Sequence, residues 1–508
     1  MRLVFRWIDK CVRNHEICKS KSPFTHRIPP TRLIQLGRTE TDDARLMDTS
    51  GLFPRHIQYA ALSYCWGSNG PRLTTTRENL AQRLCGLSTS ALPPTFRDAF
   101  KVARILKIRY LWIDSLCIVQ DDPTDWQREA MKMGDIYQAA YITLVSAAAR
   151  STNDGFLKRI RPTHVVAVPF QSSRHPDVTG RYYVSPPSPS RNGELFYEDV
   201  TGSAWNNRGW TFQERLLSQR LLFFGENALH FECRTLRWSE GYDGDLKRTN
   251  RLLEGIQKGS DTASLRQSWE HLIREYSYRS FTFNNDKLPA LSSLAAEVAK
   301  ALSNGGVSSS YLGGLWTSDL PGCLLWVSSR LPGDINKQNS KNVYIAPSWS
   351  WCSAKGIITW PLYSRENAEC ECSVLKTSLR LGHNDHMGRL RGGSITLHGF
   401  IATYQPTTIK DEKMVISYAE KYWLQPEVIA ELYFDAGLPE DIKRYARMYT
   451  LKFFLLTSVK FSSRKHGLIL VPQSLRYDDS KIYQRIGVFV MGTLWEKLDV
   501  TEATIQIE

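Results

Sequence analysis

The hydrophobic pattern alternates between strand-like and helix-like segments in the first half of the chain. Short apolar runs at 59–64, 108–113 and 141–145 are typical of buried strands. Between these runs, residues 96–106 and 126–137 carry apolar side chains at spacings of three and four, as the buried face of a helix does. This β-α-β-α-β order predicts an α/β fold with a parallel sheet flanked by helices.

The segments around this core have other patterns. Residues 1–20 carry apolar, Cys and His side chains at helical spacing, which predicts an amphipathic helix. A stretch rich in Pro, Ser and Arg at 160–200 indicates an insertion or long loop, and residues 266–300 are helix-like. From about residue 310, short apolar runs alternate with turns, which favours a β-rich region.

We therefore expect four parts along the chain. They are an N-terminal helix and connection (1–56), an α/β domain (57–238), a linker with a helical segment (239–309) and a β-rich C-terminal domain (310–508).

Composition narrows the class of protein. The formal net charge of +14 is spread along all 508 residues, which slightly favours an anionic ligand such as a nucleotide. Nucleic acid is not expected as a partner, because no zinc-finger, RNA-recognition or basic-zipper pattern occurs. Phosphate-loop, dinucleotide and serine-hydrolase motifs are missing as well. Ten cysteines are too few for a disulfide scaffold, and no secretion signal or membrane span is visible, so we expect a cytoplasmic protein.

Polar and aromatic side chains gather where the predicted strands end. In an open parallel sheet, ligands bind beyond the carboxyl ends of the strands. The candidate ligand-binding residues are Ser63, Tyr64, Trp66, Gly67, Asp114, Cys117 and Arg208. Structural interpretations stay open beside this one: core packing for Tyr64 and Trp66, a turn cap for Asp114 and a local ion pair for Arg208.

The segment 208–215 reads as the start of a helix and holds the candidate catalytic pair. Trp210 and Glu214 lie four residues apart, so they share one helix face and present an aromatic ring beside a carboxylate. A competing interpretation is a capping box, Thr211-x-x-Glu214, in which the glutamate binds the backbone at the start of its own helix.

The N-terminal segment carries Cys11, His15 and Cys18 at helical spacing. With His26 as a fourth ligand, these residues form a candidate zinc site. The alternative is that they are reduced cysteines and a histidine in the core, and this interpretation is favoured, so no bound metal is expected.

Several motifs together resemble the fungal heterokaryon-incompatibility (HET) domain. They are Leu62-Ser-Tyr-Cys-Trp-Gly67, Leu92-Pro93 with Arg97-Asp-Ala99, Tyr110-Leu-Trp-Ile-Asp114-Ser-Leu-Cys117-Ile-Val-Gln120, Asp125-Trp-x-x-Glu129 and Arg208-Gly-Trp-Thr-Phe-Gln-Glu-Arg-Leu-Leu-Ser218-x-Arg220. Their order and spacing fit the family throughout. Residues 7–18 and 311–351 are similar to stretches that often precede and follow this domain.

The resemblance implies a role in fungal non-self recognition and programmed cell death. It also implies a fold like that of the Toll/interleukin-1 receptor (TIR) domain, a TIR/flavodoxin-like parallel sheet. Some TIR domains cleave NAD with a glutamate four residues after a tryptophan on a helix, and Trp210 and Glu214 have this spacing. On this interpretation the chain is an NAD glycohydrolase, with NAD as substrate and no bound cofactor.

Two alternatives stay open. The first is a non-catalytic module that signals through a protein partner or by self-association. The second is a metabolic enzyme that uses the same scaffold for another small molecule.

Overall fold

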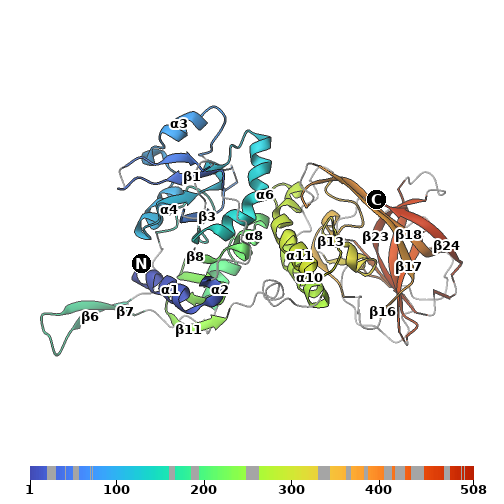
Figure 1. The fold of residues 1–508 in the computed structure, drawn as a ribbon. Coiled ribbons are helices and arrows are strands. Elements are labelled where there is room, and N and C mark those ends of the chain that lie inside the picture. The colour runs from blue at the N-terminus through green and yellow to red at the C-terminus, as the bar shows by residue number, and fades with distance from the viewer. Residues whose placement is uncertain are drawn as a thin grey trace. The chain divides into compact units, whose positions relative to one another are not determined.

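The structure is a computed structural model, and it divides the chain into two compact units, Met1–Thr249 and Asn250–Glu508 (Figure 1). It describes residues 1–19, 30–39, 42–49, 57–68, 70, 73–158, 166–184, 194–247, 262–329, 344–361, 368–382, 387–404, 415–417, 430–435, 451–460, 462–473, 481–492, 495–496 and 498–508. The finer division into four parts stays a prediction.

A nine-stranded mixed sheet forms the centre of the first unit, in the order β11-β10-β9-β8-β5-β3-β4-β1-β2. Its four middle strands are parallel: β4 (Tyr110–Trp112), β3 (Tyr59–Ser63), β5 (Ile142–Val145) and β8 (Arg220–Phe224). Strands β3, β5 and β8 are buried along their whole length, as is typical of parallel strands in a sheet with both faces covered. The predicted parallel sheet flanked by helices is confirmed.

Antiparallel strands extend this sheet at both ends. Strands β1 (Arg32–Gln35) and β2 (Arg45–Asp48) continue it beyond β4. Strands β9 (Leu229–Cys233), β10 (Leu236–Ser239) and β11 (Tyr242–Lys247) continue it beyond β8. The unit therefore uses residues on both sides of the predicted 57–238 segment.

The larger helices of the first unit follow the apolar spacing of the sequence. Helices α4 (Pro94–Ile105) and α6 (Pro123–Ala139) connect the parallel strands, and α8 (Gly209–Leu217) precedes β8. Helix α1 (Arg2–Asn14) buries Val4, Trp7, Ile8 and Cys11, and the Trp7 ring packs 6.3 Å from that of Phe231 on β9. The short elements are α2 (Glu16–Lys19), α3 (Leu80–Cys85), η2 (Thr89–Ala91), α5 (Asp114–Cys117), α7 (Glu194–Phe196) and a π-helical turn (Tyr197–Thr201).

The stretch predicted to be an insertion contains a two-stranded hairpin in its described part. Strands β6 (Val166–Gln171) and β7 (Thr179–Val184) pair only with each other, and Figure 1 shows them projecting from the first unit. Residues 160–165 and 185–193 of the predicted insertion lie outside the described residues.

The second unit begins with helices and continues as a barrel. Its helices are α10 (Thr262–Ser277) and α11 (Ser292–Asn304), with short 3₁₀ turns at Asn284–Asp286, Pro289–Leu291, Thr317–Asp319, Gly322–Leu324 and Trp351–Ser353. Two small antiparallel strand pairs also occur, β12 (Tyr311–Leu312) with β13 (Leu315–Trp316) and β14 (Val327–Ser329) with β15 (Ile357–Thr359). The helical segment and the β-rich C-terminal region thus occur in the predicted order.

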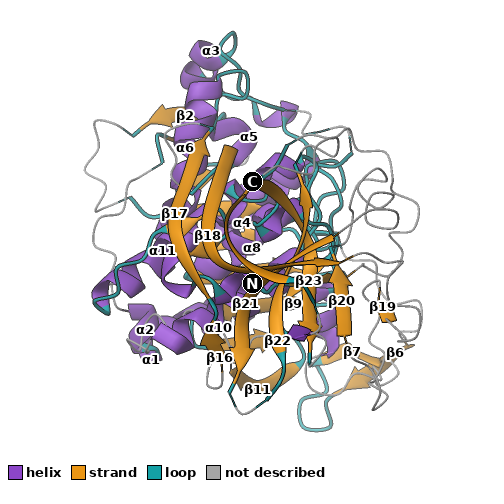
Figure 2. Cartoon of the chain, turned by 90° about the vertical axis from the view of Figure 1, so that its right-hand side faces the viewer, coloured by secondary structure: helices purple, strands orange, loops and turns teal. Residues whose placement is uncertain are grey.

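Five strands close the barrel, because the last pairs back with the first. They are β18 (Leu390–Tyr404), β21 (Leu451–Val459), β22 (Lys465–Pro472), β23 (Ile482–Met491) and β24 (Val500–Ile507), which Figure 2 shows curving around a common centre. Strands β16 (Ala368–Cys370), β17 (Cys372–Leu381), β19 (Val415–Ser417) and β20 (Ala430–Phe434) extend it. No helix in the described ranges is long and apolar enough to cross a bilayer.

Asp125 of helix α6 holds strand β1 in place through a hydrogen bond from Arg32. Asp125 is buried and accepts hydrogen bonds from the guanidinium groups of Arg32 and Arg128 and from the backbone N–H of Val119 at 2.8 Å. Burial alone would raise the pKa of Asp125, but the bonds from Arg32 and Val119 hold it below the ordinary value of 3.8. The aspartate of the Asp-Trp-x-x-Glu motif therefore has a structural role.

Replacing Asp125 by Asn should destabilise the first unit strongly. The change leaves the Arg32 guanidinium, whose side chain is 8% exposed, without its counter-ion, so we expect the free energy of unfolding to fall by about 3–5 kcal/mol. Denaturant unfolding at pH 7 measures this. The control is Asp9→Asn, which breaks the exposed pair of Asp9 with Arg13 and should cost below about 0.5 kcal/mol. Equal effects of the two variants on the free energy of unfolding would contradict the structural role of Asp125.

Candidate functional site

A buried carboxylate meets the carboxyl end of the central strand. Glu214 of α8 is 7% exposed, and its Oε2 accepts a hydrogen bond from the hydroxyl of Ser63, the last residue of β3. The same Ser63 oxygen accepts a hydrogen bond from the indole N–H of Trp205 at 2.6 Å. These two hydrogen bonds connect helix α8 and Trp205 to the carboxyl end of β3, where the candidate ligand-binding residues lie.

The capping-box interpretation of Glu214 is wrong. Helix α8 begins at Gly209 after its N-cap Arg208, so Thr211 lies inside the helix. The Thr211 hydroxyl donates to the backbone carbonyls of Trp205 at 2.9 Å and of Arg208 at 2.8 Å. Because Thr211 does not stand at the cap, Glu214 has no reciprocal partner there, and its carboxylate crosses to β3 instead.

The surroundings of Glu214 shift its pKa toward neutral pH. Burial raises the pKa of Glu214 from its ordinary value of 4.5 to about 7. The hydrogen bond from Ser63 and the charge of Arg208 oppose this rise, and the negative charge of Asp114 adds to it. With a pKa of about 7, Glu214 has both its carboxylic acid and its carboxylate form populated at neutral pH.

A second acid follows the neighbouring strand. Asp114 is half-buried and accepts hydrogen bonds from the hydroxyl of Tyr64, the indole N–H of Trp66 and the backbone N–H of Ser115, at 2.8, 2.8 and 2.7 Å. Burial raises the pKa of Asp114 despite these donors. Tyr64 and Trp66 are therefore more than packing groups, because their polar atoms orient Asp114 at the strand end.

Gly67 and Arg208 shape the same edge of the sheet. Gly67 has a φ of +90°, and a Cβ there would lie 2.9 Å from the Cβ of Ser151, so this turn requires glycine. The guanidinium of Arg208 donates to the backbone carbonyl of Tyr64, and its charge lowers the pKa of both Glu214 and Asp114. Arg208 is thus the cation that balances the two acids.

Two of the candidate residues occupy other surroundings. The half-buried Trp210 ring packs edge-on against Trp126 of α6, with ring centroids 6.3 Å apart. Cys117 is fully buried, and burial raises the pKa of its thiol to about 12. Its carbonyl accepts a hydrogen bond from Arg32 at 2.8 Å, which is a core environment.

Sequence patterns did not single out several polar groups of this site. Trp205 lies in a turn without a motif, and the helical spacing of Tyr137 identified it only as a core residue. The Tyr137 hydroxyl donates to the carbonyl of Leu62 at 3.3 Å and also faces Glu214. Ser146, in contrast, is expected from the sequence at the end of the third strand; it follows β5 and donates its backbone N–H to the carbonyl of Ser63 at 3.0 Å.

Buried polar atoms near this strand end lack partners. Within the described part of the chain, the Ser146 hydroxyl and both side-chain amide atoms of Gln213 form no hydrogen bond. Buried polar atoms nearly always have a partner, so unpaired ones are typical of a place that binds water or a ligand.

A buried chain of Ser239, His230 and Asp199 has a structural role. Ser239 lies 2.7 Å from Nδ1 of His230, whose Nε2 lies 3.0 Å from Asp199. All three side chains are buried, and Asp199 also accepts the backbone N–H groups of Asn227 and Ala228. This network fastens the turn between β8 and β9, and its serine is not available to a substrate.

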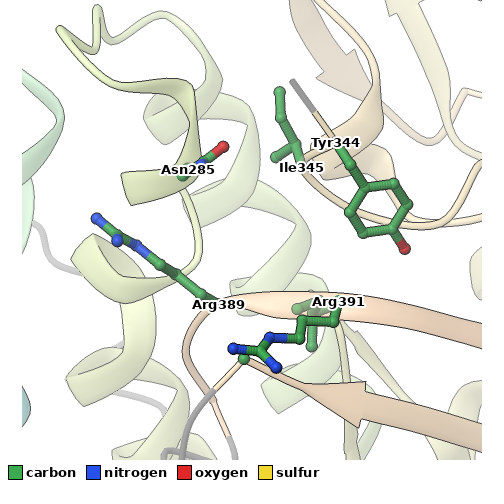
Figure 3. Close-up of a pocket in the computed structure, with 7 residues that line it drawn as sticks. Asn285, Tyr344, Ile345, Arg389 and Arg391 are labelled. Carbon is green, nitrogen blue, oxygen red and sulfur yellow. The ribbon is translucent and has the colours of Figure 1, made fainter. Parts of the chain in front are cut away.

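The second unit contains a pocket of its own. It is lined by Asn285, Tyr344, Ile345, Gly382, Arg389, Leu390 and Arg391. Figure 3 shows Arg389 and Arg391 at the start of β18, with Asn285 across from Arg389. Arg389 forms an ion pair with Asp286 at 2.7 Å, so part of the positive charge is already balanced.

A separate group of side chains in the first unit could hold a metal ion. The ligand atoms of Cys11, His15, Cys18 and Cys233 all lie within 4.8 Å of one another, and all four residues are buried. Three of them belong to the N-terminal candidate set, whereas Cys233 follows them by more than two hundred residues. His26, the fourth ligand considered from the sequence, lies outside the described residues.

Comparison with known proteins gives one match. Residues 59–214 match the family model described as heterokaryon incompatibility protein (HET), which suggests a role in heterokaryon incompatibility. The chain has no significant match among curated proteins or solved structures. The matched range contains Ser63, Asp114 and Trp205 and ends at Glu214. The chain therefore carries a HET domain over residues 59–214.

Proposed function

We propose that the HET domain of this protein hydrolyses NAD at the nicotinamide–ribose bond and acts in fungal non-self recognition by programmed cell death. The observation that carries the proposal is the buried carboxylate of Glu214, held by Ser63 at the carboxyl end of β3. A carboxylate with little water around it stabilises a developing positive charge far more strongly than one in solvent does.

The topology of the parallel strands supports this use of the site. Numbered by their order in the chain, the middle strands β4, β3, β5 and β8 have the order 2-1-3-4. The flavodoxin-like doubly wound fold has the same order, and it binds its ligand between its first and third strands. The corresponding strands here are β3 and β5, beside Ser63 and Ser146. This agreement supports a TIR/flavodoxin-like sheet with its ligand at this edge.

The chemistry requires charge stabilisation more than acid catalysis. When the C–N bond between ribose and nicotinamide breaks, the electron pair goes to the cationic ring, and nicotinamide leaves as a neutral molecule. The ribose then carries an oxocarbenium-like charge, which a carboxylate stabilises as in glycoside hydrolysis. Water adds to this carbon and releases one proton, and ADP-ribose is the product. Glu214 would face the cation.

The half-buried rim of the site offers groups for the rest of the nucleotide. Trp66 is partly exposed, and its indole ring can stack on a base. Arg208 is partly exposed as well, and its planar guanidinium suits two oxygens of a pyrophosphate. Under this proposal the rim binds the nucleotide, while Ser63 and Glu214 form the floor at the ribose.

Replacing Glu214 by Gln should strongly reduce NAD turnover. Glutamine keeps the shape and can still accept the Ser63 hydrogen bond, but it carries no charge. Loss of one electrostatic group of this kind typically costs about 10²–10³ in kcat. The measurement is release of nicotinamide and ADP-ribose from NAD by the purified full chain, followed by chromatography.

The control is Glu226→Gln, which removes an exposed carboxylate from the turn after β8 and should leave the rate unchanged. Turnover by Glu214→Gln at the rate of the unaltered protein would exclude Glu214 as the charge stabiliser. Absence of turnover in the unaltered protein, together with cell killing on overexpression, would instead favour the non-catalytic association module. A different metabolite retained by the purified protein, found by mass spectrometry, would favour the metabolic enzyme.

The pH dependence of turnover should follow the ionisation of Glu214. Only the carboxylate stabilises a cation, so kcat/KM should rise with pH through about 7, where Glu214 loses its proton. The Ser63 hydrogen bond lowers the pKa of Glu214, so Ser63→Ala should move the midpoint of this profile to higher pH. A lower rate with an unchanged midpoint would mean that Ser63 acts only through packing.

Burial of Glu214 should reduce stability at high pH. The folded state holds the Glu214 proton more tightly than the unfolded chain does, so this contribution to stability is lost as pH rises from 4.5 to about 7. The difference corresponds to about 3 kcal/mol. Glu214→Gln has no proton to lose, so its free energy of unfolding relative to the unaltered protein should increase between pH 5 and pH 8. Denaturant unfolding at both pH values checks this, and a pH-independent difference would contradict the buried carboxyl.

A further inference from the structure

We propose that Cys11, His15, Cys18 and Cys233 form a structural zinc site that joins the N-terminal helices to the turn between β9 and β10. All four residues lie outside the range that matches the HET family model, so this site goes beyond the proposed NAD chemistry.

The donor atoms are already close to the spacing that zinc requires. Nδ1 of His15 lies 3.3 Å from the Sγ of Cys233 and 4.0 Å from the Sγ of Cys18, and the four ligand atoms lie within 4.8 Å of one another. A tetrahedral ion with Zn–S bonds of about 2.3 Å and a Zn–N bond of about 2.0 Å needs donors about 3.5–3.8 Å apart. Small rotamer adjustments therefore suffice to close the site.

The local structure explains why these residues converge. Cys11 lies on the buried face of α1, and His15 directly follows that helix as its C-cap. Cys18 stands in the short helix α2, and Cys233 is the last residue of β9. His15 is held in place by stacking on Trp238 of β10, with ring centroids 5.7 Å apart and an interplanar angle of 22°.

Hydrogen-bond donors surround the sulfur atoms, as they do around metal-bound thiolates. The backbone N–H of Leu236 donates to the Sγ of Cys233 at 3.3 Å, three residues along the β9–β10 turn. The Thr235 hydroxyl lies 3.7 Å from the Sγ of Cys18. Such donors stabilise negative charge on sulfur and orient the ligands of metal sites.

A cation also lies where a site with three thiolates needs one. Three thiolates, a neutral imidazole and Zn²⁺ have a net charge of −1. Arg220 is 4% exposed and donates to the backbone carbonyl of Cys18 at 3.0 Å, so its guanidinium lies next to the group. This charge offsets the excess that the thiolates would bring into a buried environment.

Other interpretations account for only part of the arrangement. Core packing explains buried thiols, but it does not explain why a buried imidazole turns a ring nitrogen toward two sulfur atoms. A disulfide would use two of the three cysteines and leave the third thiol and the histidine without a function. A set of three sulfur donors and one nitrogen donor selects zinc over magnesium or calcium, and four protein ligands indicate a structural site.

The test is the metal content of the full chain, purified under reducing conditions without chelators. Elemental analysis should give about one zinc per chain. Replacing zinc by Co²⁺ should give the visible absorption of a tetrahedral cobalt–thiolate centre. Cys233→Ser should lose the metal, and the matched control Cys85→Ser, which alters an exposed cysteine of α3, should keep it.

A second variant keeps the test decisive if Cys233→Ser does not fold. His15→Cys retains four ligands, so it should still bind one metal per chain, with a cobalt spectrum changed by the fourth sulfur. Glu214→Gln should bind zinc normally, which separates this proposal from the NAD chemistry. A reduced, folded protein that takes up neither zinc nor cobalt would overturn the proposal, and so would a disulfide between any two of these cysteines in the protein as isolated.

Discussion

Removal of water from one carboxylate is the constraint around which the first unit is arranged. Glu214 lies where α8 crosses the end of β3, and burial makes its ionised form costly. Groups from several elements reduce this cost, namely the Ser63 hydroxyl, the charge of Arg208 and the Tyr137 hydroxyl. None of them balances it completely. An imperfectly balanced buried charge reduces stability, and natural proteins retain such groups mainly where function requires them.

Much of the fold followed from the sequence because it depends on local periodicity. Continuous apolar runs and helical spacing located β3, β5, α4 and α6 to within a few residues. The prediction of a capping box at Thr211 was wrong for a physical reason. The three-residue spacing of Thr211 and Glu214 is the same whether Glu214 binds the start of its own helix or a residue of β3, so the spacing does not distinguish the two. Trp205 and Cys233 were not predicted, because their partners Ser63 and His15 lie 142 and 218 residues away in the sequence. No spacing within a local segment indicates such contacts.

Hydrogen bonds connect the two candidate sites of the first unit. The backbone carbonyl of Cys18 accepts hydrogen bonds from the side chains of Gln219, which follows Ser218 at the end of α8, and Arg220, the first residue of β8. At the end of that helix, the Ser218 hydroxyl donates to the carbonyl of Glu214 at 2.6 Å. The N-terminal helical pair thus supports the segment that carries the buried acid, and order at one site contributes to order at the other.

The antiparallel flanks of the sheet determine what can fold independently. A fragment cut to residues 59–214 would lack β1 and β2 on one side and β8 to β11 on the other. The backbone donors and acceptors of β4 and β5 would then face solvent as open edges, which invite pairing between molecules and aggregation. Helix α8 would also stop at Glu214 without its last turn. The stretch recognisable as a family domain is therefore the interior of a larger compact unit, which is separated from the second unit near residue 249.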